Sequence, residues 1–272
     1  MLEVTSLGSG SCGNAFLLRT ATTSLLIDCG VGMRRMAGAL RGHNLALTDV
    51  DAVLISHEHG DHIRELPRFV AARTPLLSSP GTAAAVAAPR DRWHESLPAR
   101  PITVGNVEVV AIPVRHDAAE PCGFLVRTPD AAVTVVTDLG IASPAAMEAI
   151  AESRLVVLEA NHDETMVRNG PYPPHLQRRI LSETGHLSNR ACGEMLAAAL
   201  LGSRSMPTVW LAHLSASNNR PLLAKQTVER RLARSGLYLD VVPLPRRDVG
   251  ATWSPDRPHR AVSQLTLDLF SR

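Results

Sequence analysis

A short segment near residue 60 contains four potential metal ligands, three histidines and an aspartate. It reads His57-Glu58-His59-Gly60-Asp61-His62 and directly follows the apolar stretch 52–56. Imidazole nitrogens and carboxylate oxygens are ligands that zinc and manganese both accept, and two imidazoles separated by one residue can converge on one cation. The remaining carboxylate and imidazole can turn toward a second cation, so this segment predicts a site with room for two divalent ions.

Three further candidate ligands stand where other apolar stretches end. His116, Asp138 and His213 each close a β-branched or leucine-rich run that predicts a strand. Several strand ends can share one cleft, and five histidines with two aspartates fit two metals of four to five ligands each. The predicted metal ligands are therefore His57, His59, Asp61, His62, His116, Asp138 and His213.

Asp28 closes the apolar stretch 25–27 and is a candidate for a different role. We predict that its carboxylate orients the histidine segment as a hydrogen-bond acceptor and does not itself bind metal. The alternative is an aspartate that merely forms the turn after a strand.

These residues need a scaffold that brings distant strand ends together. Strands early in the chain with helices following later favour an α+β fold, in which two sheets pack face to face and helices cover them. The predicted strands cover residues 2–7, 15–19, 24–28, 52–56, 107–114, 123–127 and 132–137, and the predicted helices cover 33–40, 65–72, 144–151, 189–201 and 222–235.

Composition narrows the class of protein. The chain has 272 residues, of which 45% are hydrophobic and 20% are charged, so it can bury a sizeable core. A net charge of +2 gives no overall field that demands a nucleic acid or a membrane, and four cysteines without a Cys-x-x-Cys pair indicate no thiolate zinc site. Without a signal peptide pattern or an apolar run long enough to span a membrane, a cytoplasmic protein with no membrane partner is expected.

In sequence order, Asp28, the His57-x-His59-x-Asp61-His62 motif, His116, Asp138 and His213 resemble the five signature motifs of the metallo-β-lactamase superfamily. The resemblance spans residues 1 to about 245 and implies a four-layer αββα sandwich with a dinuclear site at one sheet edge. The two divalent ions would be zinc or manganese, because histidine and carboxylate ligands accept both. One ion would be held by His57, His59 and His116, the other by Asp61, His62 and His213, with Asp138 as the bridge.

Three more segments resemble motifs of the ribonuclease Z-like nucleases, namely 158–161, 185–188 and 212–215. Such motifs point to phosphodiester hydrolysis, in which a carboxylate that polarises a histidine supplies the general acid for a poor leaving group. Glu159 and His186 would protonate the leaving sugar oxygen, and Asp61 would orient the attacking water; a structural ion pair is the alternative for Glu159 and His186. Because His186 and His213 both stand in a His-Leu-Ser context, their roles could be exchanged, and His213 is favoured as the ligand because it directly follows a strand.

The segments 7–14, 116–121, 159–163 and 185–189 together resemble the YycJ (WalJ) family of bacterial DNA exonucleases. This implies a DNA exonuclease with the 5′-to-3′ polarity of that family. His162, Asp163 and Ser215 become candidate substrate contacts, although Asp163 fits a helix N-terminus equally well. A ribonuclease Z-like RNA-processing enzyme, a small-molecule hydrolase of the glyoxalase II kind and a clamp-bound repair adaptor with a vestigial site remain as alternatives.

Residues 246–272 are predicted to form a flexible tail after a nuclease domain of residues 1–245, since proline and arginine dominate from Pro243 onward. The tail contains Gln264-Leu265-Thr266-Leu267-Asp268-Leu269-Phe270, which resembles the peptide by which bacterial replication and repair proteins bind the DNA sliding clamp. A strand folded back onto the domain is the alternative. The predicted clamp contacts are Gln264, Leu265, Leu267, Leu269 and Phe270.

Overall fold

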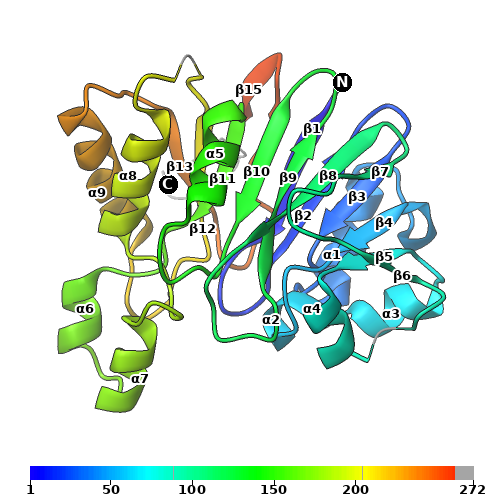
Figure 1. The fold of residues 1–272 in the computed structure, drawn as a ribbon, viewed down its shortest axis with the longest axis horizontal. Coiled ribbons are helices and arrows are strands. Elements are labelled where there is room, and N and C mark those ends of the chain that lie inside the picture. The colour runs from blue at the N-terminus through cyan, green and yellow to red at the C-terminus, as the bar shows by residue number, and fades with distance from the viewer. Residues whose placement is uncertain (88, 204, 261–272) are drawn as a thin grey trace, which may run out of the picture.

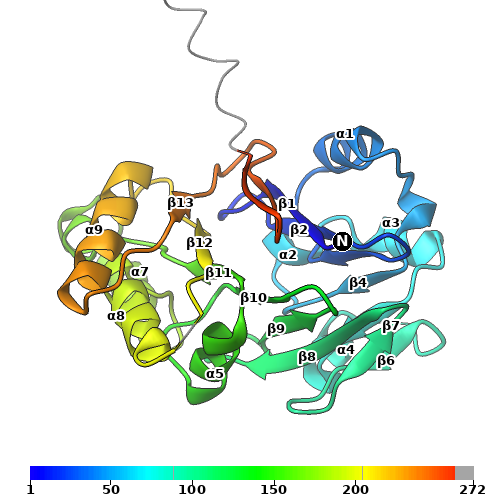
Figure 2. The same ribbon diagram turned by 90° about the horizontal axis from the view of Figure 1, so that it is seen from above.

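Two β-sheets face each other in the structure, and helices cover their outer sides (Figure 1 and Figure 2). The structure is a computed structural model that describes residues 1–87, 89–203 and 205–260. In spatial order, the first sheet consists of β15 (Arg257–Arg260), β14 (Thr252–Ser254), β1 (Glu3–Gly8), β2 (Ala15–Arg19), β3 (Ser24–Ile27), β4 (Ala52–Leu54), β5 (Leu76–Ser78) and β6 (Trp93–Glu95). The second consists of β13 (Val241–Pro243), β12 (Thr208–Ala212), β11 (Leu155–Glu159), β10 (Ala132–Val136), β9 (Cys122–Arg127), β8 (Val107–Pro113) and β7 (Ile102–Val104).

The helices lie mainly on the two outer faces of this sandwich. Buried side chains of α1 (Met33–Gly42) and α3 (Leu66–Ala71) pack on the first sheet, and those of α5 (Pro144–Glu152), α8 (Asn189–Leu200) and α9 (Pro221–Arg234) pack on the second. Figure 2 shows these two helical layers on opposite sides, so the predicted four-layer αββα, α+β architecture is confirmed. The remaining short helices are η1 (Leu47–Asp49), α2 (Gly60–Ile63), α4 (Pro80–Ala85), α6 (Glu164–Asn169) and α7 (Pro174–Ile180).

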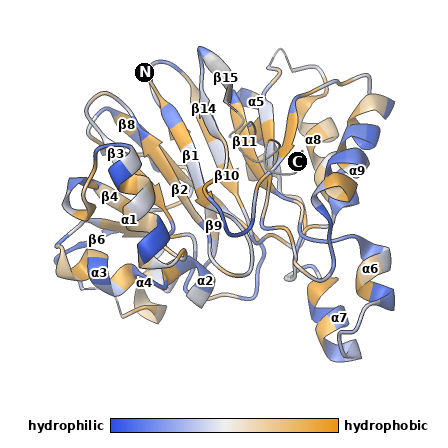
Figure 3. Cartoon of the chain, turned by 180° about the vertical axis from the view of Figure 1, so that it is seen from behind, coloured by the Kyte–Doolittle hydropathy of each residue, from blue (hydrophilic) through white to orange (hydrophobic). Residues whose placement is uncertain are grey.

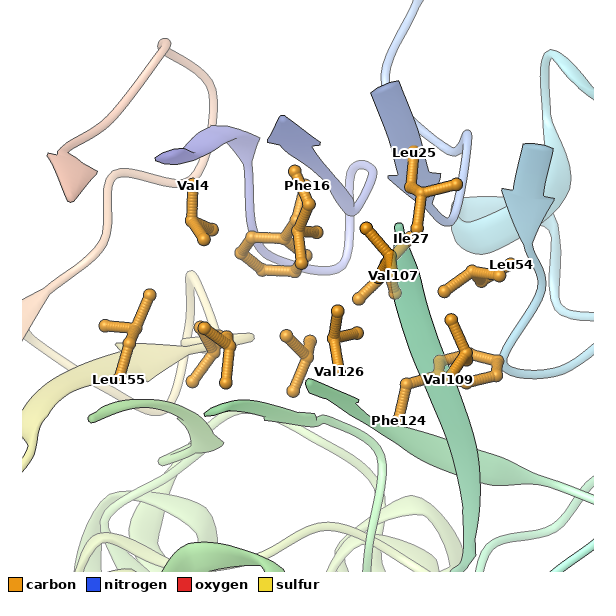
Figure 4. Close-up of a cluster of buried hydrophobic side chains, with 14 of the residues drawn as sticks. Val4, Phe16, Leu25, Ile27, Leu54, Val107, Val109, Phe124, Val126 and Leu155 are labelled. Atoms are coloured by element: carbon orange, nitrogen blue, oxygen red, sulfur yellow. The ribbon is translucent and has the colours of Figure 1, made fainter. Parts of the chain in front are cut away.

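Strand residues alternate between the core that separates the sheets and the cores under the helices. In β11, Leu155 and Val157 face the other sheet, whereas Val156 and Leu158 face the helices. Figure 4 shows side chains of the first sheet, such as Phe16, opposite side chains of the second. Because both faces of β11 are buried, residues 155–158 form a continuous apolar run. Hydrophobic residues are prominent among the strands in Figure 3, although some strands also carry polar residues.

Parallel pairing puts the ends of several strands at one edge. β3 pairs with β4 in parallel, and β11 pairs in parallel with both β10 and β12. In open sheets of parallel strands, ligands bind outside the carboxyl ends of the strands. The predicted site residues follow these same ends, which explains how residues more than 180 positions apart, such as Asp28 and His213, come together.

The prediction of a flexible tail from residue 246 is wrong for residues 246–260. β14 pairs antiparallel with β1, and Trp253 is buried in the core between the sheets. The side chain of Arg246 donates hydrogen bonds to three backbone carbonyl oxygens, those of Leu214, Ser215 and Asn219. Prolines are compatible with short edge strands, so proline content alone does not identify a tail. The fold therefore extends beyond residue 245, and the predicted clamp contacts at 264–270 lie outside the described residues.

Some predicted elements differ in extent, and others escaped prediction. The helix predicted at 65–72 is α3, which is one residue shorter at each end, and the strand predicted at 107–114 is β8, which ends one residue earlier. The strands that were not predicted as such include β5, β6, β7, β13, β14 and β15, which have only three or four residues and show no periodicity that a sequence could reveal. Among the described residues, no helix has both the length and the apolar character that crossing a membrane requires.

Candidate metal centre

The histidine segment forms a compact loop between β4 and α2. His57 lies in the loop, His59 directly precedes α2, and Asp61 and His62 lie in the first turn of this helix. The ring centre of His57 is 4.6 Å from that of His59 and 4.1 Å from that of His62. The loop thus gathers its imidazoles in one place, as their spacing predicts.

Three site residues adopt a left-handed backbone conformation just after a strand. The φ angles are 59° for Asp28, 55° for Asp138 and 52° for His213. Positive φ is uncommon outside glycine, although Asp and His tolerate it better than most residues, and it costs on the order of 1–3 kcal/mol. The backbone N–H of His213 donates to Oγ of Ser9 at 2.9 Å, which helps to hold this turn. The fold therefore fixes these side chains at the sheet edge at the expense of local strain.

The predicted ligands come together in overlapping sets, each with its ligand atoms within 4.8 Å of one another. Asp138 lies between the sets, because its Oδ2 is 3.1 Å from Nε2 of His62 and its Oδ1 is 3.8 Å from Nε2 of His116. The geometry therefore contains overlapping groups of side chains, each of which could hold a cation. The sets are His57, His59 and His116; Asp61, His62 and His213; His57, His62 and Asp138; and Asp138, Glu159, His186 and His213.

Two orphaned atoms test whether this cluster suits a metal. Nε2 of His57 and Nε2 of His116 are buried and have no hydrogen-bond partner among the described residues. An unpaired buried polar atom is costly, and a metal ion would use each of these lone pairs. Imidazole with carboxylate is also a donor set that divalent ions such as zinc or manganese accept, so the residues fit such a group.

Electrostatics in the cluster indicate competition between protons and a cation. Burial lowers the pKa of His57 well below its usual value. Burial also acts to lower the pKa of His62, but the charges of Asp138 and Asp28 outweigh it and raise this pKa to about 10. A proton on a histidine with a raised pKa, such as His62, partly neutralises the buried carboxylates beside it. A divalent ion that binds the same nitrogen must therefore displace this proton.

Asp28 occupies the position predicted for an orienting carboxylate. Its Oδ2 accepts a hydrogen bond from Nδ1 of His62 at 2.7 Å, and its Oδ1 accepts one from the backbone N–H of Ser56 at 2.8 Å. With Nδ1 of His62 engaged in this way, Nε2 of the same ring faces Asp138. Asp28 therefore sets which nitrogen of His62 points into the cluster.

Glu159 connects two histidines at the edge of the cluster. Its Oε1 is 2.9 Å from Nδ1 of His186 and 2.8 Å from Nδ1 of His213. Its Oε2 accepts hydrogen bonds from the backbone N–H groups of Leu139 and Leu187, both at 3.0 Å. Burial acts to raise the pKa of Glu159, but these histidines outweigh it and lower this pKa to about 2, so the carboxylate is charged at neutral pH.

The predicted substrate contacts separate into two places. Ser215 lines a cavity together with His186. His162 and Asp163 instead line another cavity, between α6, α8 and α9. Asp163 caps α6 by accepting a hydrogen bond from the backbone N–H of Met166 at 3.0 Å, which is the alternative that its sequence position left open. His162 is buried, and burial lowers its pKa to about 4.

Several polar residues of the cluster were not predicted. Oγ of Ser56 donates to Asp28 at 2.8 Å, and the side-chain amide of Asn14 lies 3.1 Å from Nε2 of His62. The side-chain amide of Asn161 donates to the backbone carbonyl of His213 at 2.8 Å. The sequence hints at these residues only through their position. Ser56 precedes the histidine segment, and Asn14 and Asn161 belong to the segments 7–14 and 158–161 that resemble family motifs.

Comparisons with known proteins agree with this geometry. A family model described as a beta-lactamase superfamily domain matches residues 23–210. The chain is 33% identical to exodeoxyribonuclease YycJ of Bacillus anthracis over 243 residues, which cover 86% of this chain and 90% of that relative. The chain belongs to the metallo-β-lactamase superfamily. Together with the histidine and aspartate sets, this makes it a metal-dependent hydrolase.

Other members of the metallo-β-lactamase superfamily show how far the likeness reaches. Exodeoxyribonuclease WalJ of Streptococcus pneumoniae is 33% identical over 86% of this chain, and ribonuclease Z of Mycobacterium bovis is 36% identical over 32% of it. Among solved structures, YhfI of Bacillus subtilis superposes with a TM-score of 0.70 at 17% identity, covering 93% of this chain and 98% of that one. Zn(2+)-bound PqqB of Methylobacterium extorquens has a TM-score of 0.69 at 16% identity, covering 93% and 99%. These two structures share the fold.

Proposed function

We propose that this protein is a DNA exonuclease that hydrolyses phosphodiester bonds with two divalent metal ions, zinc or manganese. The observation that carries the proposal is the pairing of buried Glu159 with partly exposed His186 beside the ligand cluster. Phosphodiester hydrolysis needs such a general acid because a sugar alkoxide is a poor leaving group. The relatives named exodeoxyribonuclease align over 86% of the chain, whereas those named ribonuclease Z align over 32% to 51% of it, which favours DNA.

We assign the ligands by which atoms lie together. When bound, the two divalent ions would supply an activated water and stabilise the negative charge that develops at phosphorus. The carboxylate of Asp61 lies among these ligands and would orient the water. One ion would be held by His57, His59 and His116, the other by Asp61, His62 and His213, with Asp138 between them.

The general acid in this proposal is His186. Its Nδ1 faces Glu159, so the proton that leaves is the one on Nε2. Burial acts to lower the pKa of His186, but the charge of Glu159 and the hydrogen bond to it outweigh this and raise the pKa. The raised pKa favours the imidazolium form, and Glu159 keeps the ring oriented while the proton passes to the sugar oxygen.

Both ring nitrogens of His213 face carboxylates of the cluster, which suits the role of a ligand. Its Nδ1 faces Glu159, and its Nε2 is 3.4 Å from Oδ2 of Asp61. The side chain is 3% exposed, whereas that of His186 is 23% exposed. This difference supports His213 as the ligand and His186 as the acid.

The proposal extends to the biological setting that the sequence predicts. We propose 5′-to-3′ polarity, a cytoplasmic location, and a role in bacterial DNA repair or replication with recruitment by the sliding clamp through residues 264–270. Deletion of residues 263–272 should then abolish capture by the purified clamp and leave turnover of short duplexes unchanged. Undiminished capture would overturn the clamp assignment alone.

The decisive experiment compares labelled duplex DNA with precursor tRNA as substrates of the metal-loaded protein. We expect release of mononucleotides from DNA, loss of this activity on exhaustive chelation, and loss in Asp61→Ala but not in Asp91→Ala, a control at an exposed aspartate. DNA degradation that survives chelation or Asp61→Ala would refute the metal mechanism. Cleavage of precursor tRNA without degradation of DNA would indicate a ribonuclease Z-like enzyme instead.

A further inference from the structure

A cavity of about 270 Å³ adjoins the metal centre, and the proposed function leaves most of its lining without a role. His186 and Ser215 line it on the side of the cluster. Tyr172, Leu176 and Arg179 line it from the segment that contains α6 and α7. In Figure 1 this segment extends beyond the edge of the sandwich.

We propose that this cavity holds the terminal nucleoside of the DNA strand, with Tyr172 stacking on its base and Arg179 binding its phosphate. This inference rests on the proposed function. His186 delivers a proton to the sugar oxygen that leaves, so the nucleoside that carries this oxygen must lie on the His186 side of the cluster. The water oxygen bonds to phosphorus, the bond from phosphorus to the sugar oxygen breaks, and this oxygen takes the proton of His186 while the proton of the water passes to solvent.

Tyr172 is held in place by its neighbours. It stands in Pro171-Tyr172-Pro173-Pro174, and proline fixes its own φ and restricts the residue before it. The side chain of Gln177 donates a hydrogen bond to the backbone carbonyl of Tyr172 at 2.8 Å. A half-buried aromatic ring on a rigid segment loses little conformational entropy when a ligand binds. Such a ring suits sequence-tolerant stacking, because every base offers an aromatic face.

Asp117 orients the guanidinium of Arg179 through one of its three nitrogens. Nε of Arg179 donates to Oδ2 of Asp117 at 2.5 Å, and among the described residues the two terminal nitrogens of the guanidinium make no hydrogen bond or ion pair. Asp117 is itself tied to the wall of the cavity, because its backbone N–H donates to the carbonyl of Thr184 at 3.1 Å. A planar guanidinium fork binds phosphate oxygens in pairs, so Arg179 suits a phosphate and Asp117 acts as its positioning residue.

The size of the cavity agrees with a single occupant. A volume of about 270 Å³ suits one nucleoside and is too small for several stacked ones. A strand end can place one nucleoside there, whereas an internal nucleotide remains joined on both sides. The helical segment α6–α7 would therefore favour removal of nucleotides from an end.

The test compares the two tyrosines of the chain. Tyr172→Ala should weaken binding of a 5′-phosphorylated, 3′-fluorescein-labelled oligonucleotide to the EDTA-treated protein, and should raise KM on DNA, each about 5- to 100-fold. Tyr172→Phe should restore both values. Tyr238→Ala is the matched control, since Tyr238 is 79% exposed and lies in another cavity beside α9. Turnover of bis(p-nitrophenyl) phosphate by Tyr238→Ala should stay near the wild-type value, because Tyr238 lies outside the cavity beside the metal centre.

Arg179 has its own matched pair. Arg179→Ala should weaken binding of the 5′-phosphorylated oligonucleotide about tenfold more than binding of the same oligonucleotide with a 5′-hydroxyl. Arg178→Ala, at an exposed neighbouring residue, should change the affinity for the 5′-phosphorylated and the 5′-hydroxyl oligonucleotide by the same factor. Equal affinities and equal KM for wild type, Tyr172→Ala and Tyr238→Ala on a protein that does degrade DNA would overturn this inference alone. A wild-type protein that hydrolyses bis(p-nitrophenyl) phosphate but not DNA would overturn the proposed function, and this inference with it.

Discussion

Two segments of the chain carry the same tripeptide, His-Leu-Ser, at residues 186–188 and 213–215. Both histidines direct Nδ1 at Oε1 of Glu159, at 2.9 Å and 2.8 Å. His213 directly follows β12 and is enclosed by the ligand cluster, whereas His186 lies in the loop after α7 and lines a cavity. The two histidines therefore have the same local sequence but different proposed roles, because the Nε2 atoms of their rings face different surroundings.

The largest expected effect comes from removing the enclosed member of this pair. His213→Ala should reduce the bound metal and lower DNA turnover by about 10³-fold or more, because a ligand is lost. His186→Ala should keep the wild-type metal content. Elemental analysis and turnover of the purified variants measure both effects, with His94→Ala as a control at an exposed histidine on β6. Normal metal content in His213→Ala together with metal loss in His186→Ala would exchange the two roles.

The next effect separates proton transfer from metal binding at His186. His186→Ala should lower kcat on DNA by about 10²- to 10⁴-fold, the usual contribution of a general acid. The loss should be far smaller on bis(p-nitrophenyl) phosphate, because p-nitrophenolate leaves without a proton. The ratio of the two turnover numbers in variant and wild type is the measurement. An equal loss on both substrates would mean that His186 acts through the metals or the fold.

Glu159 touches both histidines, so its replacement affects both tasks at once. Glu159→Gln should lower activity or metal affinity about 10- to 100-fold, as is usual for a residue that orients a ligand. A metal titration followed by activity at saturating metal separates the two contributions. Glu148→Gln, at an exposed glutamate of α5, provides the control. If saturating metal restores full activity, Glu159 serves His213 alone.

The smallest effect concerns a buried histidine with no carboxylate within hydrogen-bond distance among the described residues, His162. Burial lowers its pKa to about 4, against about 6.5 when unfolded. Between these values the unfolded chain binds a proton that the folded chain does not, so the free energy of unfolding decreases as the pH is lowered from about 6.5 to about 4, by up to about 3 kcal/mol. Urea unfolding of the metal-free protein near pH 7 and near pH 4.5 should show a smaller drop for His162→Gln than for wild type. His175→Gln, at an exposed histidine, should match wild type, and an equal drop in all three proteins would contradict the prediction.

Much of the layered fold could be predicted because it follows from local patterns. The runs 15–19 and 132–137 are long enough, and apolar enough, to indicate strands, and β2 and β10 lie there. The order of strands before helices then favours two facing sheets. Residues 246–260 escaped prediction because a short strand such as β14 is stabilised by pairing with β1 and by the burial of Trp253, and neither partner is near in sequence.

The sequence by itself determined which chemistry the site can support, because ligand types and their positions after apolar runs are local properties. His57, His59, Asp61 and His62 are close in sequence, so their proximity needed no tertiary information. Only the tertiary structure decided that Glu159 reaches both His186 and His213, that His162 and Asp163 line a separate cavity, and that Tyr172 and Arg179 line the one beside the metal centre. The physical reason is that such contacts depend on how sheets, helices and loops pack over long sequence separations, which no local periodicity records.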